Sequence, residues 1–185
     1  VVTNHTKPLS GNVEMVYGNK PVDGGFLFLD FDEKQVLLQN NPELEQWIKP
    51  VLGAQEFLNN GERYCLWLAE ASTRELRELM NITEIKRRIE GVKQMRLSSS
   101  KIQTQKIAET SWLFGEIRQP KSGTYILLPR VSSERREYVP MAFLESFIIT
   151  TDRNQMIPNA GLYEFGILNS EMHMDWMRVV TGRLK

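Results

Sequence analysis

Short apolar runs alternate with polar, turn-forming residues along most of the chain, and this pattern predicts both strands and helices. Four runs are rich in β-branched, aromatic and aliphatic residues and are bounded by Gly, Pro, Asn or Ser, as is typical of strands. They are residues 26–29, 63–68, 124–128 and 147–151. Strands and helices do not alternate regularly, as they would in a doubly wound sheet. We therefore expect a mixed α+β fold with largely antiparallel strands and interspersed helices.

Helical spacing and capping residues mark most of the segments between these strands. The predicted helices are residues 33–40, 42–49, 72–79, 82–97, 101–109 and 171–180. The expected N-terminal caps are Asn41, Ser72, Asn81, Ser100 and Ser170. Residues 162–168 fit no single pattern and stay open. In the last helix, Met172, Trp176, Val179 and Val180 are expected to belong to the core, with His173 as a structural neighbour.

The helix at residues 82–97 is the clearest, because Ile82, Ile85, Ile89 and Val92 recur at spacings of three and four. Basic residues dominate the stretch from residue 86 to residue 106: Lys86, Arg87, Arg88, Lys93, Arg96, Lys101 and Lys106 stand against Glu90 alone. A solvated surface helix explains this pattern. The alternative is a phosphate site at the start of the next helix, made by Ser100, Lys93, Arg96 and Lys101.

Residues 112–140 form the stretch best suited to hold a ligand. We expect residues 116–119 to pair with the strand at 124–128 across a turn at 120–123. A polar loop follows this strand and carries Arg130, Ser132, Ser133, Glu134, Arg135 and Arg136. A loop fixed by a rigid strand is a common mount for recognition side chains.

The residue types in that loop suit nucleic acid. The flat fork of a guanidinium binds guanine O6 and N7, or a phosphate, through two parallel hydrogen bonds. Glu134 matches the N4 donor of cytosine, and either serine matches a phosphate or a base edge. The plainer alternative is a solvated hairpin end with internal ion pairs, which contribute about 0–1 kcal/mol each.

Composition sets few limits on function. Lys+Arg and Asp+Glu both total 23 in the 185 residues, so the net charge indicates no partner. The single cysteine, Cys65, lies in an apolar run and excludes an internal disulfide, which favours a reduced, cytoplasmic setting. No apolar run is long enough to cross a bilayer, so we expect no membrane association. The chain starts without Met and ends abruptly, as an excised piece of a larger protein would.

Motifs for enzyme chemistry are missing from the sequence. It has no Gly-rich nucleotide loop, no nucleophile elbow and no His-Glu-x-x-His zinc motif, and its two histidines are poorly placed for a triad. Asp30 and Asp32 fit a metal site or, more simply, the N-terminal cap of a helix. We expect no catalytic, cofactor or metal residues in this chain.

Long strings in the sequence resemble one known family. They include GNKPVDGGFLFL, IKPVLGAQEFLNNGERYCLWL, LFGEIRQPKSGTYILLPRVSSERREYVPMAFL and LYEFGILNSEMHMDWMRVVTGRLK. Together they are similar to the target-recognition domain of type IIL, MmeI-type restriction-modification enzymes and of their methyltransferase-only relatives. The resemblance implies a larger bacterial protein with an adenine-N6 DNA methyltransferase domain and, in many members, a nuclease. S-adenosylmethionine, and Mg²⁺ where a nuclease is present, would bind outside this chain.

The resemblance also implies a partner and a site. Residues 1–25 would be a lead-in from the upstream methyltransferase domain, and residues 26–185 the recognition domain, which binds double-stranded DNA and is possibly truncated at its C-terminus. The expected base-reading region is 118–138, with Arg130, Ser132, Ser133, Glu134, Arg135 and Arg136 as candidates. The candidate phosphate contacts are Lys93, Arg96, Ser100, Lys101, Arg118 and Lys121. The alternative is a protein-interaction or scaffold domain that docks through its basic helix.

Overall fold

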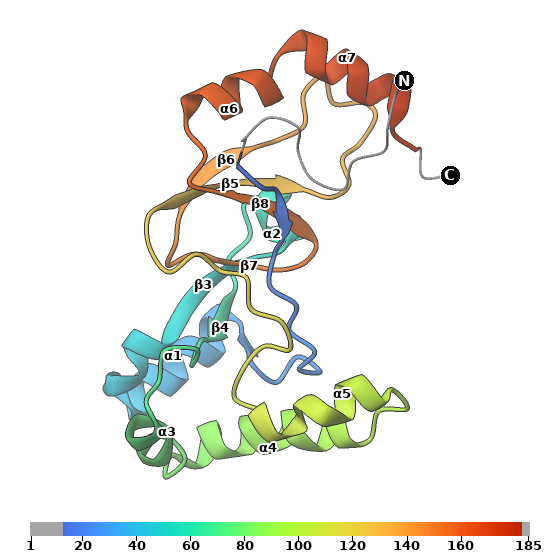
Figure 1. The fold of residues 1–185 in the computed structure, drawn as a ribbon. Coiled ribbons are helices and arrows are strands. Elements are labelled where there is room, and N and C mark those ends of the chain that lie inside the picture. The colour runs from blue at the N-terminus through green and yellow to red at the C-terminus, as the bar shows by residue number, and fades with distance from the viewer. Residues whose placement is uncertain (1–12, 183–185) are drawn as a thin grey trace.

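The computed structural model describes residues 13–182, which form two four-stranded sheets with helices around them (Figure 1). The first sheet has the order β1 (Val16–Tyr17), β8 (Asn154–Pro158), β5 (Thr124–Pro129) and β6 (Ala142–Glu145). The second has the order β2 (Phe28–Leu29), β4 (Tyr64–Leu66), β3 (Ile48–Leu52) and β7 (Ile149–Thr150). Named strands pair antiparallel except β3 with β7. The expected mixed α+β class is therefore confirmed.

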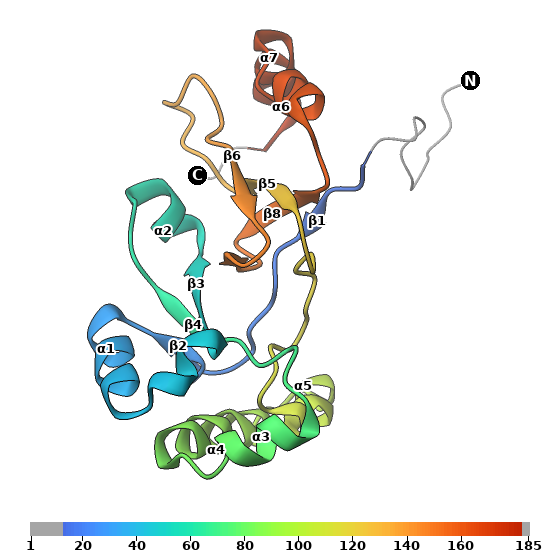
Figure 2. The ribbon, with the colours of Figure 1, turned by 90° about the vertical axis from the view of Figure 1, so that its left-hand side faces the viewer.

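The helices gather at the two ends of the molecule and along one side (Figure 2). Helices α6 (Leu162–Leu168) and α7 (Glu171–Val180) lie beside the first sheet. Helices α3 (Thr73–Leu79), α4 (Thr83–Leu97) and α5 (Ile102–Lys106) lie at the opposite end. The remaining elements are α1 (Phe31–Asn40), α2 (Ala54–Asn59) and the 3₁₀ helices η1 (Pro42–Trp47) and η2 (Ile107–Thr110). Within the described chain, no helix is both long and apolar enough to cross a membrane.

Strand β5 is the centre of the first sheet, and its residues from Tyr125 onward are buried. Alternate side chains enter two apolar clusters: Ile126 packs with Ile157, and Leu127 packs with Met156. The predicted partner at 116–119 is wrong, because β8 and β6 already occupy both edges of β5. Glu116 instead bridges to Lys20. The segment before β5 is thus joined to the start of the chain.

The predicted helix starts are partly confirmed. Asp30 and Ser72 each form a reciprocal cap with a glutamate three residues later, and Ser170 caps α7. The side chains of Asn41, Asn81 and Ser100 cap nothing, since η1 has no side-chain cap and α4 and α5 follow Ile82 and Lys101. The open segment 162–168 is helix α6.

The larger core lies between α4, α1 and the second sheet. Ile85, Ile89 and Val92 are buried there, as their spacing predicts, and Ile82 packs against them. Cys65 is buried in the same cluster, as expected. Two arginines expected on the solvated face of α4, Arg88 and Arg96, are also buried.

The core prediction for α7 is wrong. Met172, Trp176, Val179 and Val180 are all exposed, and Met174 is the buried residue of this helix. Met174, on the opposite side of α7 from this stripe, is the residue that contacts the rest of the domain, where its Sδ accepts from Val139 N–H (3.4 Å).

Residues 13–25 contribute a strand and a buried residue to the fold. Val16 and Tyr17 form the edge strand β1 beside β8, and Asn19 is fully buried. The predicted domain boundary at residue 25 stays a prediction, and residues 1–12 of the expected lead-in lie outside the described part of the chain.

Candidate nucleic-acid interface

The arginine loop, residues 130–138, leaves β5 and leads to β6. Its backbone is held near both ends: Arg130 N–H donates to the Arg153 carbonyl (3.1 Å), and the Glu137 carbonyl accepts from Arg178 of α7 (2.6 Å). Next to the loop, Val139 N–H donates to Met174 Sδ (3.4 Å). The turn that leads into β8 and helix α7 therefore fix where this loop sits.

The middle of the arginine loop is exposed to solvent. Ser133 closes a local turn, because its carbonyl accepts from Arg136 N–H (3.0 Å) and its hydroxyl accepts from Arg135 N–H (3.2 Å). Glu134 is also exposed, whereas Ser132 Oγ is buried and lacks a hydrogen-bond partner among the described residues. For residues 13–182, the structure places no hydrogen bond or ion pair on the guanidinium of Arg135 or Arg136. Two guanidinium forks are thus presented from a fixed backbone.

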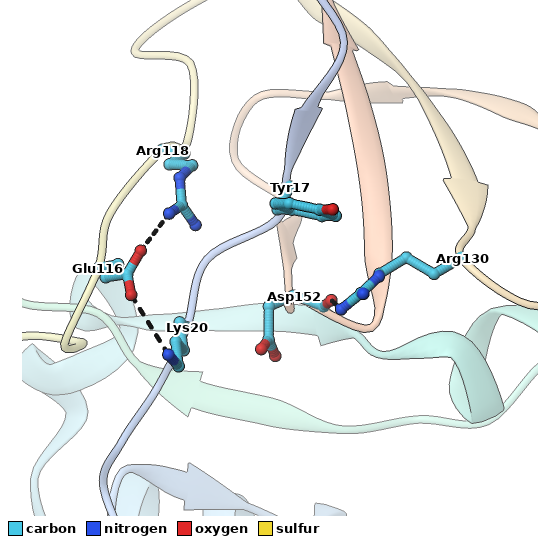
Figure 3. Close-up of a pocket in the computed structure, with 6 residues that line it drawn as sticks. All are labelled: Tyr17, Lys20, Glu116, Arg118, Arg130 and Asp152. Atoms are coloured by element: carbon cyan, nitrogen blue, oxygen red, sulfur yellow. Dashed lines mark hydrogen bonds and ion pairs between the residues drawn. The ribbon is translucent and has the colours of Figure 1, made fainter.

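Beside the loop lies a polar depression of about 240 Å³ (Figure 3). It is lined by Tyr17, Lys20, Glu116, Arg118, Arg130 and Asp152. Arg130 stacks over the Tyr17 ring at 4.6 Å and donates to the Asp152 carbonyl (3.2 Å). The side chain of Arg118 pairs with Glu116 and donates to the Gly18 carbonyl (3.2 Å). The sequence candidates Arg118 and Arg130 therefore line one site.

The charges of this depression are coupled. Glu116 accepts from Lys20 (3.4 Å) as well as from Arg118. Burial on its own would raise the pKa of Glu116, but the two cations outweigh it and hold that pKa below its ordinary value. Three cationic and two anionic side chains line the depression, which leaves a surplus of positive charge for an anionic ligand.

Asn19 lies beneath this site and holds its segments together, and the sequence patterns missed it. Its Oδ1 accepts from the backbone N–H groups of Arg118 (2.7 Å) and Gln119 (2.9 Å), and its Nδ2 donates to Gln119 Oε1 (2.8 Å). The Asn19 carbonyl accepts from Asp152 N–H (2.8 Å). The Asn19 Nδ2 also donates to the Thr150 carbonyl (2.9 Å), so one buried asparagine joins three segments that are far apart in sequence. An Asn in a polar stretch gives no local sign of this.

Comparison with known proteins places the chain in a family. Residues 1–185 match the model described as "MmeI, target recognition domain". The chain belongs to the MmeI target recognition domain family. It is 38% identical over 185 residues to DNA methyltransferase A of Bacillus subtilis (strain 168), a match that covers all of this chain and 21% of that protein.

A solved structure agrees with the family. The type IIL restriction-modification enzyme MmeI in complex with DNA matches this target recognition domain with a TM-score of 0.90 and 38% identity. The match covers 97% of this chain and 24% of that one. This target recognition domain therefore spans about a quarter or less of the length of these two relatives, and the resemblance seen in its sequence is confirmed.

One predicted phosphate contact of the target recognition domain is wrong. Arg96 is fully buried, and its guanidinium donates to five backbone carbonyls, those of Pro21, Val22, Ile107, Thr110 and Leu113. Burial lowers the pKa of Arg96 from its ordinary value, although nearby Asp23 opposes the shift. Its donors tie α4 to η2 and to the chain before β2, so none is left for a phosphate.

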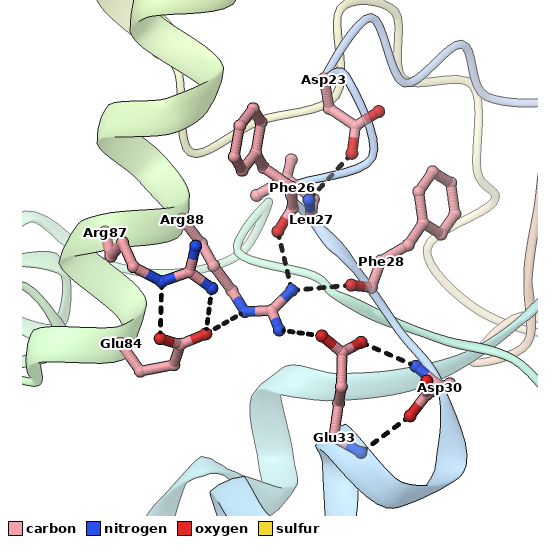
Figure 4. Close-up of polar contacts among 9 residues, drawn as sticks. All are labelled: Asp23, Phe26, Leu27, Phe28, Asp30, Glu33, Glu84, Arg87 and Arg88. Carbon is pink, nitrogen blue, oxygen red and sulfur yellow. Dashed lines mark hydrogen bonds and ion pairs between the residues drawn. The ribbon is translucent and has the colours of Figure 1, made fainter.

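The other basic residues of α4 are largely engaged within the domain. Arg88 is buried and donates to Glu33, Glu84 and the carbonyls of Phe26 and Phe28 (Figure 4). Exposed ion pairs join Arg87 to Glu84 (2.7 Å) and Lys86 to Glu90 (3.8 Å). Lys93 pairs with Glu109 (3.7 Å). The basic face that the sequence predicts is therefore mostly neutralised.

Ser100, Lys101 and Lys121, the remaining phosphate candidates, are exposed but do not share one site with the arginine loop. Lys121 lines a second depression of about 280 Å³ together with Trp67, Ile117 and Phe147. Lys101 precedes α5, at the other end of the domain from α7 (Figure 2). Because Ser100, Lys101 and Lys121 are exposed, they remain predicted phosphate contacts.

The described residues of this target recognition domain offer little support for a metal site or a cysteine nucleophile. Asp30 caps α1, which favours the simpler explanation of the Asp30 and Asp32 pair. Residues 13–182 contain no group of three or more His, Cys, Asp or Glu side chains arranged to hold a metal ion. Burial raises the pKa of the Cys65 thiol well above its ordinary value, so this cysteine is a core residue and not a nucleophile.

Proposed function

We propose that this chain is the DNA sequence-recognition module of a single-chain bacterial DNA adenine methyltransferase or restriction-modification enzyme. The observation that carries the proposal is the arginine loop, where Arg135 and Arg136 are exposed on a backbone fixed by the turn before β8 and by α7. The relatives support it, since one is a DNA methyltransferase and another is a restriction-modification enzyme in complex with DNA. The proposal places the protein in the cytoplasm.

In this proposal the arginine loop enters a groove and reads base edges. Each guanidinium is long enough and flat enough to bind a guanine through two hydrogen bonds. Ser133 and Glu134 lie beside the arginines in the same exposed stretch. The depression with Lys20, Arg118 and Arg130 supplies a phosphate contact that positions the loop without reading sequence.

Catalysis belongs to the rest of the polypeptide. The recognised adenine would be extruded from the duplex into a separate methyltransferase domain, because its N6 atom is not accessible to that chemistry in the stack. That domain would bind S-adenosylmethionine, and a nuclease domain, where present, would use Mg²⁺.

The reading surface is tested by methylation patterns of the full-length polypeptide. Arg135→Ala and Arg136→Ala are expected to relax or abolish site choice, at a cost of about 1–3 kcal/mol for each lost bidentate contact. Arg74→Ala is the matched control, since Arg74 is an exposed arginine of α3 whose ion pair is with Glu78 (3.0 Å). Sequencing of methylated DNA gives the sites. Unchanged patterns in both loop variants would refute the assigned reading surface.

The phosphate contacts are tested by salt dependence. Arg118→Ala and Lys121→Ala should each reduce the slope of log affinity against log salt by about 0.9. Heparin serves as a competitor of similar charge that has no groove to read. If heparin displaces cognate and non-cognate duplexes equally well, binding is by charge alone and groove reading is refuted.

The alternative, a scaffold domain that docks through its basic helix, has weak support. The bases of α4 are buried or paired: Arg88 with Glu33 and Glu84, Arg87 with Glu84, Lys86 with Glu90, and Lys93 with Glu109. An acidic partner would have to break these internal pairs before it gained new ones.

A further inference from the structure

Helix α7 carries an apolar stripe on its outward side. Met172, Trp176, Val179 and Val180 follow one another at helical spacing, and they are 78%, 63%, 82% and 51% exposed. The preceding helix α6 adds Leu162 and Tyr163, which are 81% and 72% exposed. Single exposed apolar residues are normal, but clusters of this kind mark contact surfaces.

The stripe is a second face of α7, distinct from the face that packs against the rest of the domain. The inner face already holds the helix in place, because Met174 is buried and accepts from Val139 N–H. Arg178 donates to the Glu137 carbonyl and pairs with Asp175 (2.6 Å). Met174 and Arg178 already attach α7 to the rest of the domain, so the outer apolar stripe is not needed for that contact and is left for a second body.

We propose that the outer stripe of α7 docks on an apolar segment of the same longer polypeptide, outside residues 1–185. The two relatives are long enough to supply this segment, since the chain covers only 21% and 24% of them. The proposal does not depend on which ligand the arginine loop binds.

The charge pattern of α7 argues against two other occupants. Helices that lie on membrane surfaces or track nucleic acid are rich in Lys and Arg. Helix α7 has two acidic residues, Glu171 and Asp175, and its one arginine, Arg178, is already paired. An uncharged apolar surface is the chemistry that fits the stripe.

Docking at this face would orient the arginine loop. Because Arg178 holds Glu137 and Met174 holds Val139, a body that fixes α7 from outside also fixes the end of the loop. Figure 1 shows α7 above the first sheet at the end of the molecule, where nothing else in the described chain covers its outer side.

Thiol labelling of the full-length polypeptide tests this interface. Val179→Cys places a thiol of similar size in the stripe, and Val36→Cys is its matched control, since Val36 is an exposed valine (59%) of α1. Cys65 is fully buried and adds no background of its own in the folded protein. Maleimide labelling of each peptide is followed by mass spectrometry, with the urea-unfolded polypeptide as reference. The thiol at position 179 is expected to react at least about tenfold more slowly in the folded polypeptide, and the thiol at position 36 is expected to stay reactive.

A second substitution tests the stripe as a unit. Trp176→Glu, added to Val179→Cys, should restore fast labelling at position 179, because a buried carboxylate weakens the contact. Labelling of Val179→Cys as fast as that of Val36→Cys would overturn the proposal. So would protection that requires high protein concentration, which indicates a second copy, or protection that requires added duplex DNA.

Discussion

Asn19 holds Arg118 in place: the Arg118 N–H donates to Asn19 Oδ1 over 2.7 Å, although the two residues are 99 positions apart. This bond sets the start of the chain beside the segment that precedes β5. It also places the Arg118 side chain in the depression with Lys20 and Arg130. The electrostatics of the site therefore depend on a neutral side chain that contacts no solvent.

Asn19→Ala is expected to lower the free energy of unfolding by about 1–3 kcal/mol, because the Arg118 and Gln119 N–H groups lose their acceptor. Urea unfolding measures the change. Asn40→Ala is the control, since the Asn40 amide donates to the Val36 carbonyl (2.9 Å) on an exposed helix surface. Equal stability of the two variants would show that the Asn19 carboxamide does not hold these segments.

Arg96→Met should destabilise the fold by about 3 kcal/mol, because five backbone carbonyls each lose a hydrogen bond from a fully buried guanidinium. Arg77→Met, at an exposed position of α3, should change stability by less than about 0.5 kcal/mol. The folded fraction of Arg96→Met, which lacks the charge, should still bind DNA with the salt slope of the unmodified protein. A reduced slope would mean that Arg96 contacts phosphate after all.

The Glu84 carboxylate, in helix α4, makes the stability of the fold depend on pH in the acid range. Hydrogen bonds from Arg87, opposed by burial and assisted by Arg88, hold the pKa of Glu84 below its ordinary value. Since the folded pKa is lower than the unfolded pKa of about 4.3, this stabilisation is present above pH 4.3 and is lost as pH falls through the folded pKa. Glu84→Gln should lower the free energy of unfolding by about 1 kcal/mol at pH 7, because the charged pairs are lost. The loss is small because Glu84 is partly exposed and solvent screens its pairs.

Urea unfolding at pH 7 and at pH 3 separates this effect from packing. The difference between Glu84→Gln and the unmodified protein should shrink at the lower pH, because protonation of the Glu84 carboxylate removes the charge that its arginine partners stabilise. Glu90→Gln serves as control, because Glu90 pairs with Lys86 at 3.8 Å on the surface. This variant should change the free energy of unfolding by less than about 0.5 kcal/mol. A difference for Glu84→Gln that does not vary with pH would contradict the electrostatic account.

Two glycines should respond to alanine in opposite directions. A Cβ at Gly18 would lie 2.2 Å from the Thr151 carbonyl oxygen, so Gly18→Ala must displace backbone and should cost about 1–3 kcal/mol. At Gly166 of α6 a Cβ meets nothing within 4 Å, and alanine should stabilise the helix by about 0.5–1 kcal/mol. Thermal or urea unfolding of both variants measures the signs. A neutral Gly18→Ala would refute the close approach of β1 to the turn at Thr151.

The local features of this protein were readable in the sequence. The apolar run at β5, the stripe Ile85, Ile89 and Val92, and the caps at Ser72 and Ser170 depend on residues only a few positions apart. The arginine loop follows from the same local reasoning, since it directly follows a buried strand. The family resemblance was readable for a different reason, because long strings of residues carry it.

The tertiary structure determined which helix faces are buried and which charged side chains are paired. Arg96 resembles a solvated base in sequence, but it is buried because carbonyls of segments up to 75 positions away converge on it. The pattern of α7 marks an apolar stripe correctly, yet the identity of its partner depends on what packs against it. The polar depression needs Tyr17, Glu116, Arg130 and Asp152, which only the pairing of distant segments brings together. Sequence determined the elements and their chemistry, because these depend on near neighbours, whereas burial and partnership depend on contacts between residues far apart in the chain.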